Sequence, residues 1–504
     1  MSEDVLDKKI YIIKKKIYDS CTRIDTSLIA YILMIVLACQ PLFSIFFNAS
    51  SSNSLVALYF GKSMLIRLIG IVGLFNAFLD YYAKRFIYKK KYWDKTFLKN
   101  PWTGLLAILL IISFLSALFS ARKNIAFFGD AYRYEGFFSY LAYAGIFASA
   151  SLIKDENRRR KLLTLFVSVS FIVALATILK DLAGVTILMP SGGRIMKWSG
   201  TFINANHYGY YLCVSMAVSL GLYQEAKSWK GKLIFGTIFL TNTFVLAMNK
   251  SYGPFLAILV GFILYSVLYI IRSGFKKAWT LLVLFTLFLL ISFLVNKGLW
   301  NDVTKTFAEF LNISSSIGEG IGSGDMDEAL DGVNGGSGRF GLWKAGIKIM
   351  LDYPIFGCGP ENVQYLMGKY GGGSMSIPHN ELIQIGANMG IPAVLVYVTA
   401  IIWFAVLTIK NTKNLSSMTL VGGIGAATYL LSSLVGVSMT VATCYLFLML
   451  GLLNSWFKEK NQEDLNKELL ESLNLGDIKK EEETNDSSKE EGSKEAESST
   501  ENKI

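Results

Sequence analysis

The stretch Ile377-Pro378-His379-Asn380-Glu381 marks the point at which the character of the chain changes. It closes a long polar segment, residues 298–377, and opens an apolar run over 380–409. His379 is one of two histidines among 504 residues. Because histidine titrates close to neutrality, it is a natural proton acceptor. The alternative interpretation is a histidine that caps a helix or anchors it at a membrane interface.

The composition is that of a membrane protein. Hydrophobic residues make up 52% of the chain and charged residues 17%, with a mean hydropathy of +0.42. These values lie outside the range of soluble globular proteins. Because about 20 apolar residues cross a bilayer as a helix, we predict an all-α, polytopic protein with about 12 transmembrane helices. The candidate spans are 27–47, 60–80, 102–120, 136–153, 162–180, 204–223, 233–249, 253–271, 278–297, 380–409, 417–436 and 439–457.

The net charge of +11 does not point to nucleic acid, because the basic residues cluster in alternate loops. The positive-inside rule explains this pattern when both termini are cytoplasmic. The cell membrane is then the location, and the polar segment 298–377 is extracytoplasmic. The basic groups are Lys14 to Lys16, Lys84 to Lys99, Arg158 to Lys161, Lys227 to Lys232, Arg272 to Lys277, and Lys410 with Lys413.

Five regions follow from this topology. Residues 1–26 form a basic cytoplasmic head that lies on anionic lipid, and 27–297 hold the first nine spans. Residues 298–377 form a large extracytoplasmic loop with short helices, and 378–457 hold the last three spans. Residues 458–504 are a charged cytoplasmic tail with almost no aromatic residues, which predicts disorder. The first apolar run is long enough to remain as a helix, so no cleavable signal peptide is expected.

Two cations lie within the second predicted span. Lys62 is close enough to its outer end to snorkel to the surface. Arg67 lies about 1.5 turns deeper, where a charge is costly and indicates a functional site by default. For Arg67 as well, snorkelling is the interpretation that we favour over a functional site.

Several outer loops carry groups that bind anions or sugars. Arg133 beside Tyr134 can hold an anion and stack a sugar, although such a pair also decorates interfaces. Arg194 follows two glycines. Asn206 and His207 lie at the start of the sixth span, where the alternative interpretation is an ordinary N-cap formed by Asn204 or Asn206. Lys250 lies in a very short turn, which keeps it near the bilayer surface, where a lipid-borne phosphate lies. A charged turn between two helices is the simpler interpretation.

The large loop contains one amphipathic helix. Its apolar residues, Phe340, Trp343, Ile347 and Met350, recur at helical spacing, and Pro354 ends it. Arg339 falls in the first turn, where a cation is electrostatically unfavourable. An anion shared between Arg339 and the helix N-terminus is one reason to keep it there.

We predict no metal site and no disulfide. The acidic cluster Asp325-Met326-Asp327-Glu328 suggests a hard cation, but acids in a glycine-rich loop are usually solvated. The five cysteines show no paired spacing.

Four motifs resemble those of the O-antigen ligase and polymerase family of bacterial membrane glycosyltransferases. His379-Asn380, nine residues and Gly390-Ile391-Pro392 resemble the family's last outer-loop motif. The other three motifs are Arg339 to Trp343 with Pro354 to Gly359, Gly200 to Asn206, and Arg133 to Gly136. One departure concerns the turn before the eighth span, where the family usually has Ser-Arg-Gly and this chain has Ser251-Tyr252-Gly253. Lys250 or Arg194 can supply the missing charge.

The resemblance implies a GT-C-like fold and an enzyme without metal or cofactor. Such an enzyme moves a glycan from an undecaprenyl-diphosphate carrier to an acceptor hydroxyl outside the cytoplasmic membrane. The acceptor is a glycan, a lipid or a protein. His379 is then the catalytic base, and His207 orients a loop. The expected substrate-binding residues are Arg339, Lys250, Arg194, Arg133, Asn380 and Asn206.

A transporter or flippase of a lipid-linked anion is the rival function. Transporters of this size show repeated halves and helices broken at the membrane midplane. This chain has no clear repeat, and its polar residues gather at the outer surface, which favours the enzyme. The motifs do not separate a ligase from a polymerase.

Overall fold

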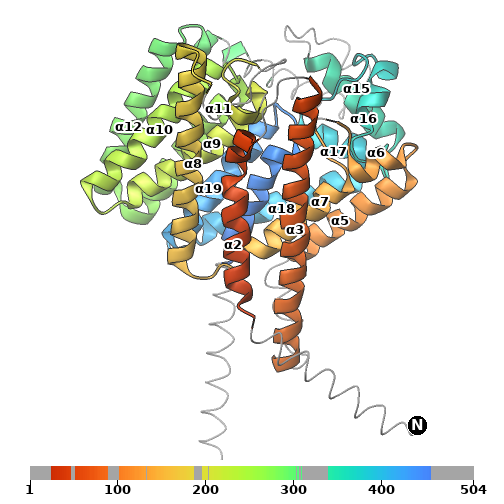
Figure 1. Cartoon of the computed structure of the whole chain (residues 1–504), viewed down its shortest axis with the longest axis horizontal. Helices are drawn as coiled ribbons and strands as arrows, with labels where there is room; N and C mark the ends of the chain where they lie inside the picture. The colour runs from red at the N-terminus through yellow and green to blue at the C-terminus, as the bar shows by residue number, and fades with distance from the viewer. Residues whose placement is uncertain are drawn as a thin grey trace, which may run out of the picture. The chain divides into compact units, whose positions relative to one another are not determined.

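In the computed structural model, all secondary-structure elements of the described residues are α-helices or 3₁₀ helices (Figure 1). The structure describes residues 24–46, 52–88, 102–186 except 132, 196–301 except 203, the positions 304, 305, 308 and 311, and 339–455. The basic head up to residue 23, Arg194, the acidic cluster 325–328 and the tail lie outside these residues. The predictions made for them therefore remain predictions.

Within the described residues, eight helices are long and apolar enough to cross a membrane, which makes the chain a multi-pass membrane protein. The eight are α2 (Thr26–Cys39), α3 (Ser52–Tyr88), α5 (Trp102–Phe119), α8 (Glu156–Ala183), α10 (Trp229–Asn249), α11 (Tyr252–Ser273), α12 (Phe275–Val295) and α18 (Ile391–Lys410). The first of them, α2, continues as a 3₁₀ helix, η1, over Gln40–Phe46.

Four further predicted spans are also helical but are shorter or less apolar. They are α7 (Phe137–Ala150), α9 (Ala205–Glu225), α19 (Ser417–Ser433) and a last helix over Thr440–Ser455. Helix α9 packs against α8, α10, α11 and α19, and nearly all of its residues are buried. A helix enclosed by other helices meets protein rather than lipid, so it tolerates polar and small residues. The polytopic helical fold is thus confirmed, and the count of 12 spans remains a prediction.

Polar contacts link the enclosed helices. Asn242 on α10 donates to the hydroxyl of Ser170 on α8 at 3.0 Å. The Tyr210 hydroxyl accepts from the backbone N–H of Val437 at 3.0 Å. Inside a membrane bundle such contacts give polar groups the hydrogen-bond partners that lipid tails cannot provide.

The snorkelling interpretation of the two cations on α3 is wrong. Lys62 is 2% exposed, and its ammonium donates to the carbonyl oxygen of Thr201 at 2.7 Å. Arg67 is 5% exposed and donates to the carbonyl oxygens of Phe128 at 2.6 Å and Tyr134 at 2.8 Å. Both side chains point into the protein because backbone carbonyls of neighbouring loops solvate the charges there.

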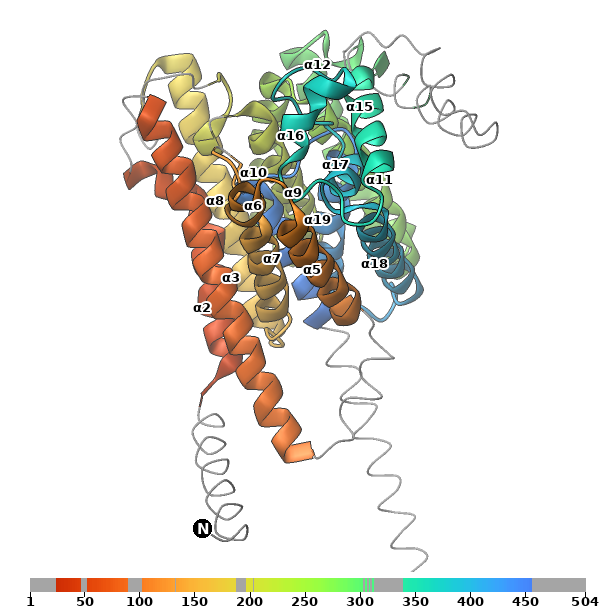
Figure 2. The same ribbon diagram turned by 90° about the vertical axis from the view of Figure 1, so that its right-hand side faces the viewer.

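The predicted span 380–409 is two helices. Helix α17 (Glu381–Met389) ends at Gly390, whose φ of +85° favours glycine, and α18 begins at Ile391. Before them come α15 (Arg339–Asp352), α16 (Val363–Leu366) and the 3₁₀ helix η3 (Met367–Tyr370). Figures 1 and 2 show α15, α16 and α17 side by side, and all three are in mutual contact.

The predicted amphipathic helix is confirmed as α15. Its buried residues include Phe340, Trp343 and Ile347, and Ile383 of α17 joins their cluster. The apolar stripe thus fixes α15 against the helix that follows His379.

Candidate functional site

Two of the motif segments form one structural unit. The loop over Pro354 to Gly359 lies against the end of α17, where the N–H of Cys358 donates to the carbonyl oxygen of Ala387 at 2.9 Å. The N–H of Ile391 donates back to the carbonyl oxygen of Pro354 at 2.8 Å. A Cβ at Gly357 would lie 2.2 Å from the carbonyl carbon of Asn388, so no larger residue fits. This contact holds the turn between α17 and α18 and, through α17, the position of His379.

His379 lies immediately before α17 and is half-buried, with a φ of +54°. A non-glycine residue rarely adopts this conformation, and such strain clusters at functional sites. The next residue, Asn380, is the N-cap of α17. Its side-chain oxygen accepts from the N–H groups of Leu382 (3.0 Å) and Ile383 (3.2 Å), so the helix is capped by the asparagine and not by His379, which the alternative interpretation proposed as the cap.

The Asn380 amide also donates to the carbonyl oxygen of Leu434 at 2.9 Å. This bond ties the start of α17 to the end of α19. Asn380 therefore positions the backbone at His379, and its substrate-binding role stays a prediction.

Arg133 lies in the loop 129–136, which joins α6 (Lys123–Phe128) to α7. The Nε of Arg133 in this loop donates to a carboxylate oxygen of Glu361 at 2.9 Å, and its Nη2 donates to the side-chain oxygen of Gln364. Arg133 is thus held by two residues that lie far from it in the sequence.

Arg133 and Arg339 both act electrostatically on His379. Burial of the imidazole, then Arg339, then Arg133 lower the pKa of His379 to about 4. Arg133 and His379 are also within electrostatic range of His207 on the first turn of α9. The Nδ1 of His207 is buried and has no hydrogen-bond partner among the described residues. The structure therefore brings together four predicted residues: Arg133, His207, Arg339 and His379.

Lys250 and Asn206 lie beside one another at the α10–α11 turn. Lys250 is exposed, with a φ of +58°. The hydroxyl of the next residue, Ser251, donates to the side-chain oxygen of Asn206 at 3.2 Å. The N-cap of α9 is Asn204, which accepts from the N–H of Asn206 at 2.8 Å. The side chain of Asn206 is exposed next to the lysine.

Two buried carboxyl groups in this region were not predicted from the sequence. Glu361 is 2% exposed, and burial raises its pKa to about 7 although Arg133 and backbone N–H donors oppose the shift. Glu135 is 1% exposed and accepts from the Tyr143 hydroxyl at 2.7 Å, and burial raises its pKa to about 8. Single acids in loops are usually solvated, so neither group was expected to be buried, although Glu135 lies within the motif Arg133 to Gly136.

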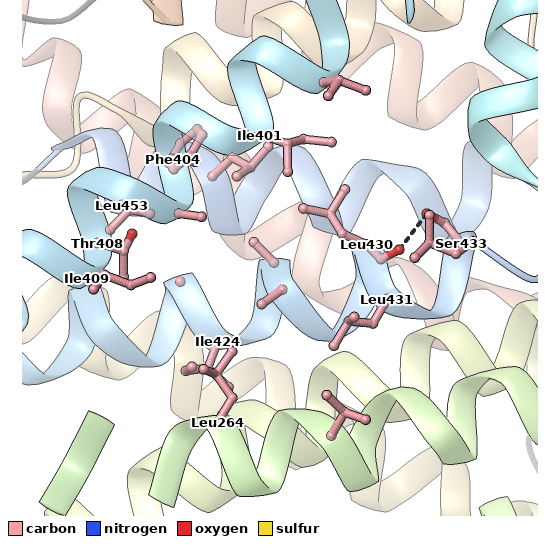
Figure 3. Close-up of a pocket in the computed structure, with 18 of the residues that line it drawn as sticks. Leu264, Ile401, Phe404, Thr408, Ile409, Ile424, Leu430, Leu431, Ser433 and Leu453 are labelled. Carbon is pink, nitrogen blue, oxygen red and sulfur yellow. Dashed lines mark hydrogen bonds between the residues drawn. The ribbon is translucent and has the colours of Figure 1, made fainter. Parts of the chain in front are cut away.

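An apolar groove leads towards the site from within the helices (Figure 3). Side chains from α11, α18 and α19 enclose about 450 Å³, among them Leu264, Ile401 and Ile424. Leu382, Ser433 and Leu434 are among the residues that line the groove, and Figure 3 shows Ser433 at the end opposite Thr408 and Ile409. Leu434 is the residue whose carbonyl oxygen accepts from Asn380, so the groove ends next to the backbone that carries His379.

No group of three or more potential metal ligands occurs within the described parts of the chain.

Tyr252, which stands where the family usually has arginine, is half-buried at the start of α11.

These features define a polytopic helical membrane protein with two arginines and a histidine at an inter-helix loop cluster. Residues 237–398 match the model of the O-antigen ligase family, and this segment belongs to that domain family. The segment contains Lys250, Arg339, His379 and Asn380, while Arg133 and Asn206 lie outside it. No curated protein matches the chain. The family match implies glycan transfer of the ligase or polymerase type.

Proposed function

We propose that this protein transfers a glycan from an undecaprenyl-diphosphate-linked donor to an acceptor hydroxyl on the outer side of the cytoplasmic membrane. The observation that carries the proposal is that Arg133, in the loop between α6 and α7, and Arg339, at the start of α15, both lie within electrostatic range of His379. Guanidinium groups bind phosphate oxygens in bidentate fashion. Two of them within electrostatic range of one imidazole suit a reaction in which diphosphate leaves and a hydroxyl attacks.

In this reaction His379 accepts the proton of the acceptor hydroxyl. The acceptor oxygen forms a bond to the anomeric carbon, and the bond from that carbon to the diphosphate oxygen breaks. The departing diphosphate keeps the electron pair, and Arg133 and Arg339 stabilise its charge. Arg133 thereby supplies the charge that Tyr252 lacks, and Lys250 and Asn206 bind the outer part of the substrate. Arg194 is a further proposed contact.

The donor's lipid tail occupies the apolar groove between α11, α18 and α19. A tail in the groove brings its headgroup to the Leu434 end, next to Asn380 and His379. This arrangement supports a membrane-borne donor. The acceptor is a lipid-anchored glycan, a growing repeat unit or a protein.

We also propose that the chain crosses the membrane 12 times, with both termini in the cytoplasm and residues 298–377 outside. A reporter active only in the cytoplasm, fused at Gly336, is then silent. Reporter activity from the Gly336 fusion would place residues 298–377 in the cytoplasm and would contradict transfer on the outer side of the membrane.

The test of function is transfer by purified protein in proteoliposomes, with a lipid-linked oligosaccharide donor, native acceptor and a chelator. Transfer is expected without added divalent metal. A requirement for magnesium or manganese contradicts the metal-independent mechanism. Movement of the donor across the bilayer without transfer supports a transporter instead.

A further inference from the structure

Glu361 joins two outer loops through one carboxylate. One of its oxygens accepts from the backbone N–H groups of Asp130 (2.6 Å) and Glu135 (2.9 Å). The other accepts from Nε of Arg133 at 2.9 Å. Both ends and the central side chain of the outer loop 129–136 therefore converge on this single buried group.

The fit around this carboxylate is close. A Cβ at Gly129, which has a φ of +77°, would lie 2.7 Å from the Glu361 oxygen that accepts the two backbone N–H groups. Glu361 itself has a φ of +60°, which is unfavourable for a residue with a side chain. The fold thus tolerates local strain in order to aim this carboxylate into the loop.

A second residue from the same segment completes the hold on the guanidinium. Gln364 accepts from Nη2 of Arg133, and its own amide donates to a carboxylate oxygen of Asp130 at 2.7 Å. On the other side of the loop, the Thr440 hydroxyl contacts the carbonyl oxygen of Arg133 at 2.9 Å. The backbone and the Nε–Nη2 edge of the side chain are thus fixed together, and none of the hydrogen bonds found among the described residues involves its Nη1.

We propose that Glu361 is a positioning residue, which holds Arg133 in the orientation that binds the donor diphosphate beside His379. The inference rests on the proposed function only for the identity of the anion. Glu361 touches no substrate itself, because its two oxygens are occupied by Arg133 and the loop backbone. Its role is to orient Arg133 before the donor arrives, so that less freedom is lost on binding.

The experiment measures binding of undecaprenyl diphosphate to the full-length protein in detergent, a readout independent of transfer. Glu361→Gln keeps the size of the side chain, but an amide has one acceptor oxygen and cannot serve both Arg133 and the backbone. We expect its Kd to rise about tenfold, which corresponds to about 1.4 kcal/mol. The matched control is Glu135→Gln, which changes an equally buried carboxyl at the end of the same loop without touching the Arg133 side chain. Its Kd is expected to stay at the wild-type value.

A double-mutant cycle separates positioning from a general effect on the fold. If Glu361 acts through Arg133, adding Glu361→Gln to Arg133→Gln causes no further loss of binding. Additive losses, or an unchanged Kd in the single variant, overturn the proposal. Should Glu361→Gln not fold, Gln364→Ala is used in the same cycle, with a smaller effect that is again lost in the Arg133→Gln background. Wild-type protein that binds the lipid but transfers no glycan refutes the proposed function without affecting this test.

Discussion

The side-chain amide of Asn380 donates to the main-chain carbonyl oxygen of Leu434 at 2.9 Å, and its oxygen caps α17. The residue after His379 is therefore tied both to its own helix and to the end of α19. The backbone at His379, with its positive φ, is set by this pair of contacts.

The first prediction follows from this relationship. Asn380→Ala removes a helix cap and leaves the Leu434 carbonyl oxygen unpaired, so we expect a loss of stability of about 1–2 kcal/mol. Because the change also loosens His379, turnover falls more than donor affinity. Thermal unfolding and donor binding of the purified variant measure the two effects. Unchanged stability together with lost donor affinity shows instead that Asn380 is a direct substrate contact.

The second prediction concerns the base. His379→Asn is a better test than His379→Ala, because asparagine tolerates the left-handed backbone conformation at this position. If His379 accepts the proton, turnover falls about 10²–10⁴-fold at an unchanged donor Kd. His207→Ala is the comparison and is expected to cost less, because His207 orients a loop. A fully active His379→Asn removes the catalytic role and favours the transporter.

The third prediction is a pH dependence. Burial, Arg339 and Arg133 lower the pKa of His379 from 6.5 to about 4, so the imidazole is neutral and able to accept a proton at neutral pH. Bound diphosphate neutralises the two arginines and raises this pKa again. The acid limb of kcat/KM, which reports the free enzyme, is thus expected near pH 4, and that of kcat at higher pH.

Steady-state rates from about pH 3 to 8 in donor-reconstituted membranes measure both limbs. Activity that increases on acidification contradicts a neutral base. Stability changes in the same direction, because a lowered histidine pKa costs folding free energy as the pH falls from 6.5 towards 4. Unfolding must therefore be followed in parallel to assign the limb of kcat/KM to the chemical step.

The fourth prediction concerns Arg339, the first residue of α15. Arg339→Ala should weaken donor binding more than it changes stability, and Arg339→Lys should restore part of the affinity, because lysine keeps the charge but loses the two-point contact. The alanine variant also raises the pKa of His379, since one cation is gone. Donor titrations and an NMR titration of labelled histidine check the two effects. Wild-type affinity in the alanine variant disproves the assignment.

The fifth prediction tests the groove of Figure 3. Ala427 lines it on α19, and Ala427→Trp fills part of its volume. We expect a KM about tenfold higher for the undecaprenyl donor, because apolar tail contacts are lost, and no change for a donor with two isoprene units. Ala107→Trp, at an exposed position on α5, is the matched control. Equal effects on long and short donors argue that the tail lies elsewhere.

The sequence alone determined the apolar runs, the amphipathic α15 and a capping asparagine at the start of α9, although it left Asn204 and Asn206 as alternatives. These features depend on residues within a few turns of one another, and hydrophobic period and capping chemistry report such local relationships. The motifs identified the family for the same reason, because each is a short contiguous pattern. Even so, the break at Gly390 was missed, since a single glycine within an apolar run does not reveal a positive φ.

Only the tertiary structure decided how the site is assembled. Arg133 meets Glu361 and approaches His379 across long sequence separations, and Lys62 and Arg67 turn inward to carbonyl groups of distant loops. No local pattern encodes such pairings. A buried charge depends on which polar groups the fold brings within hydrogen-bond distance, because desolvation makes it unfavourable anywhere else.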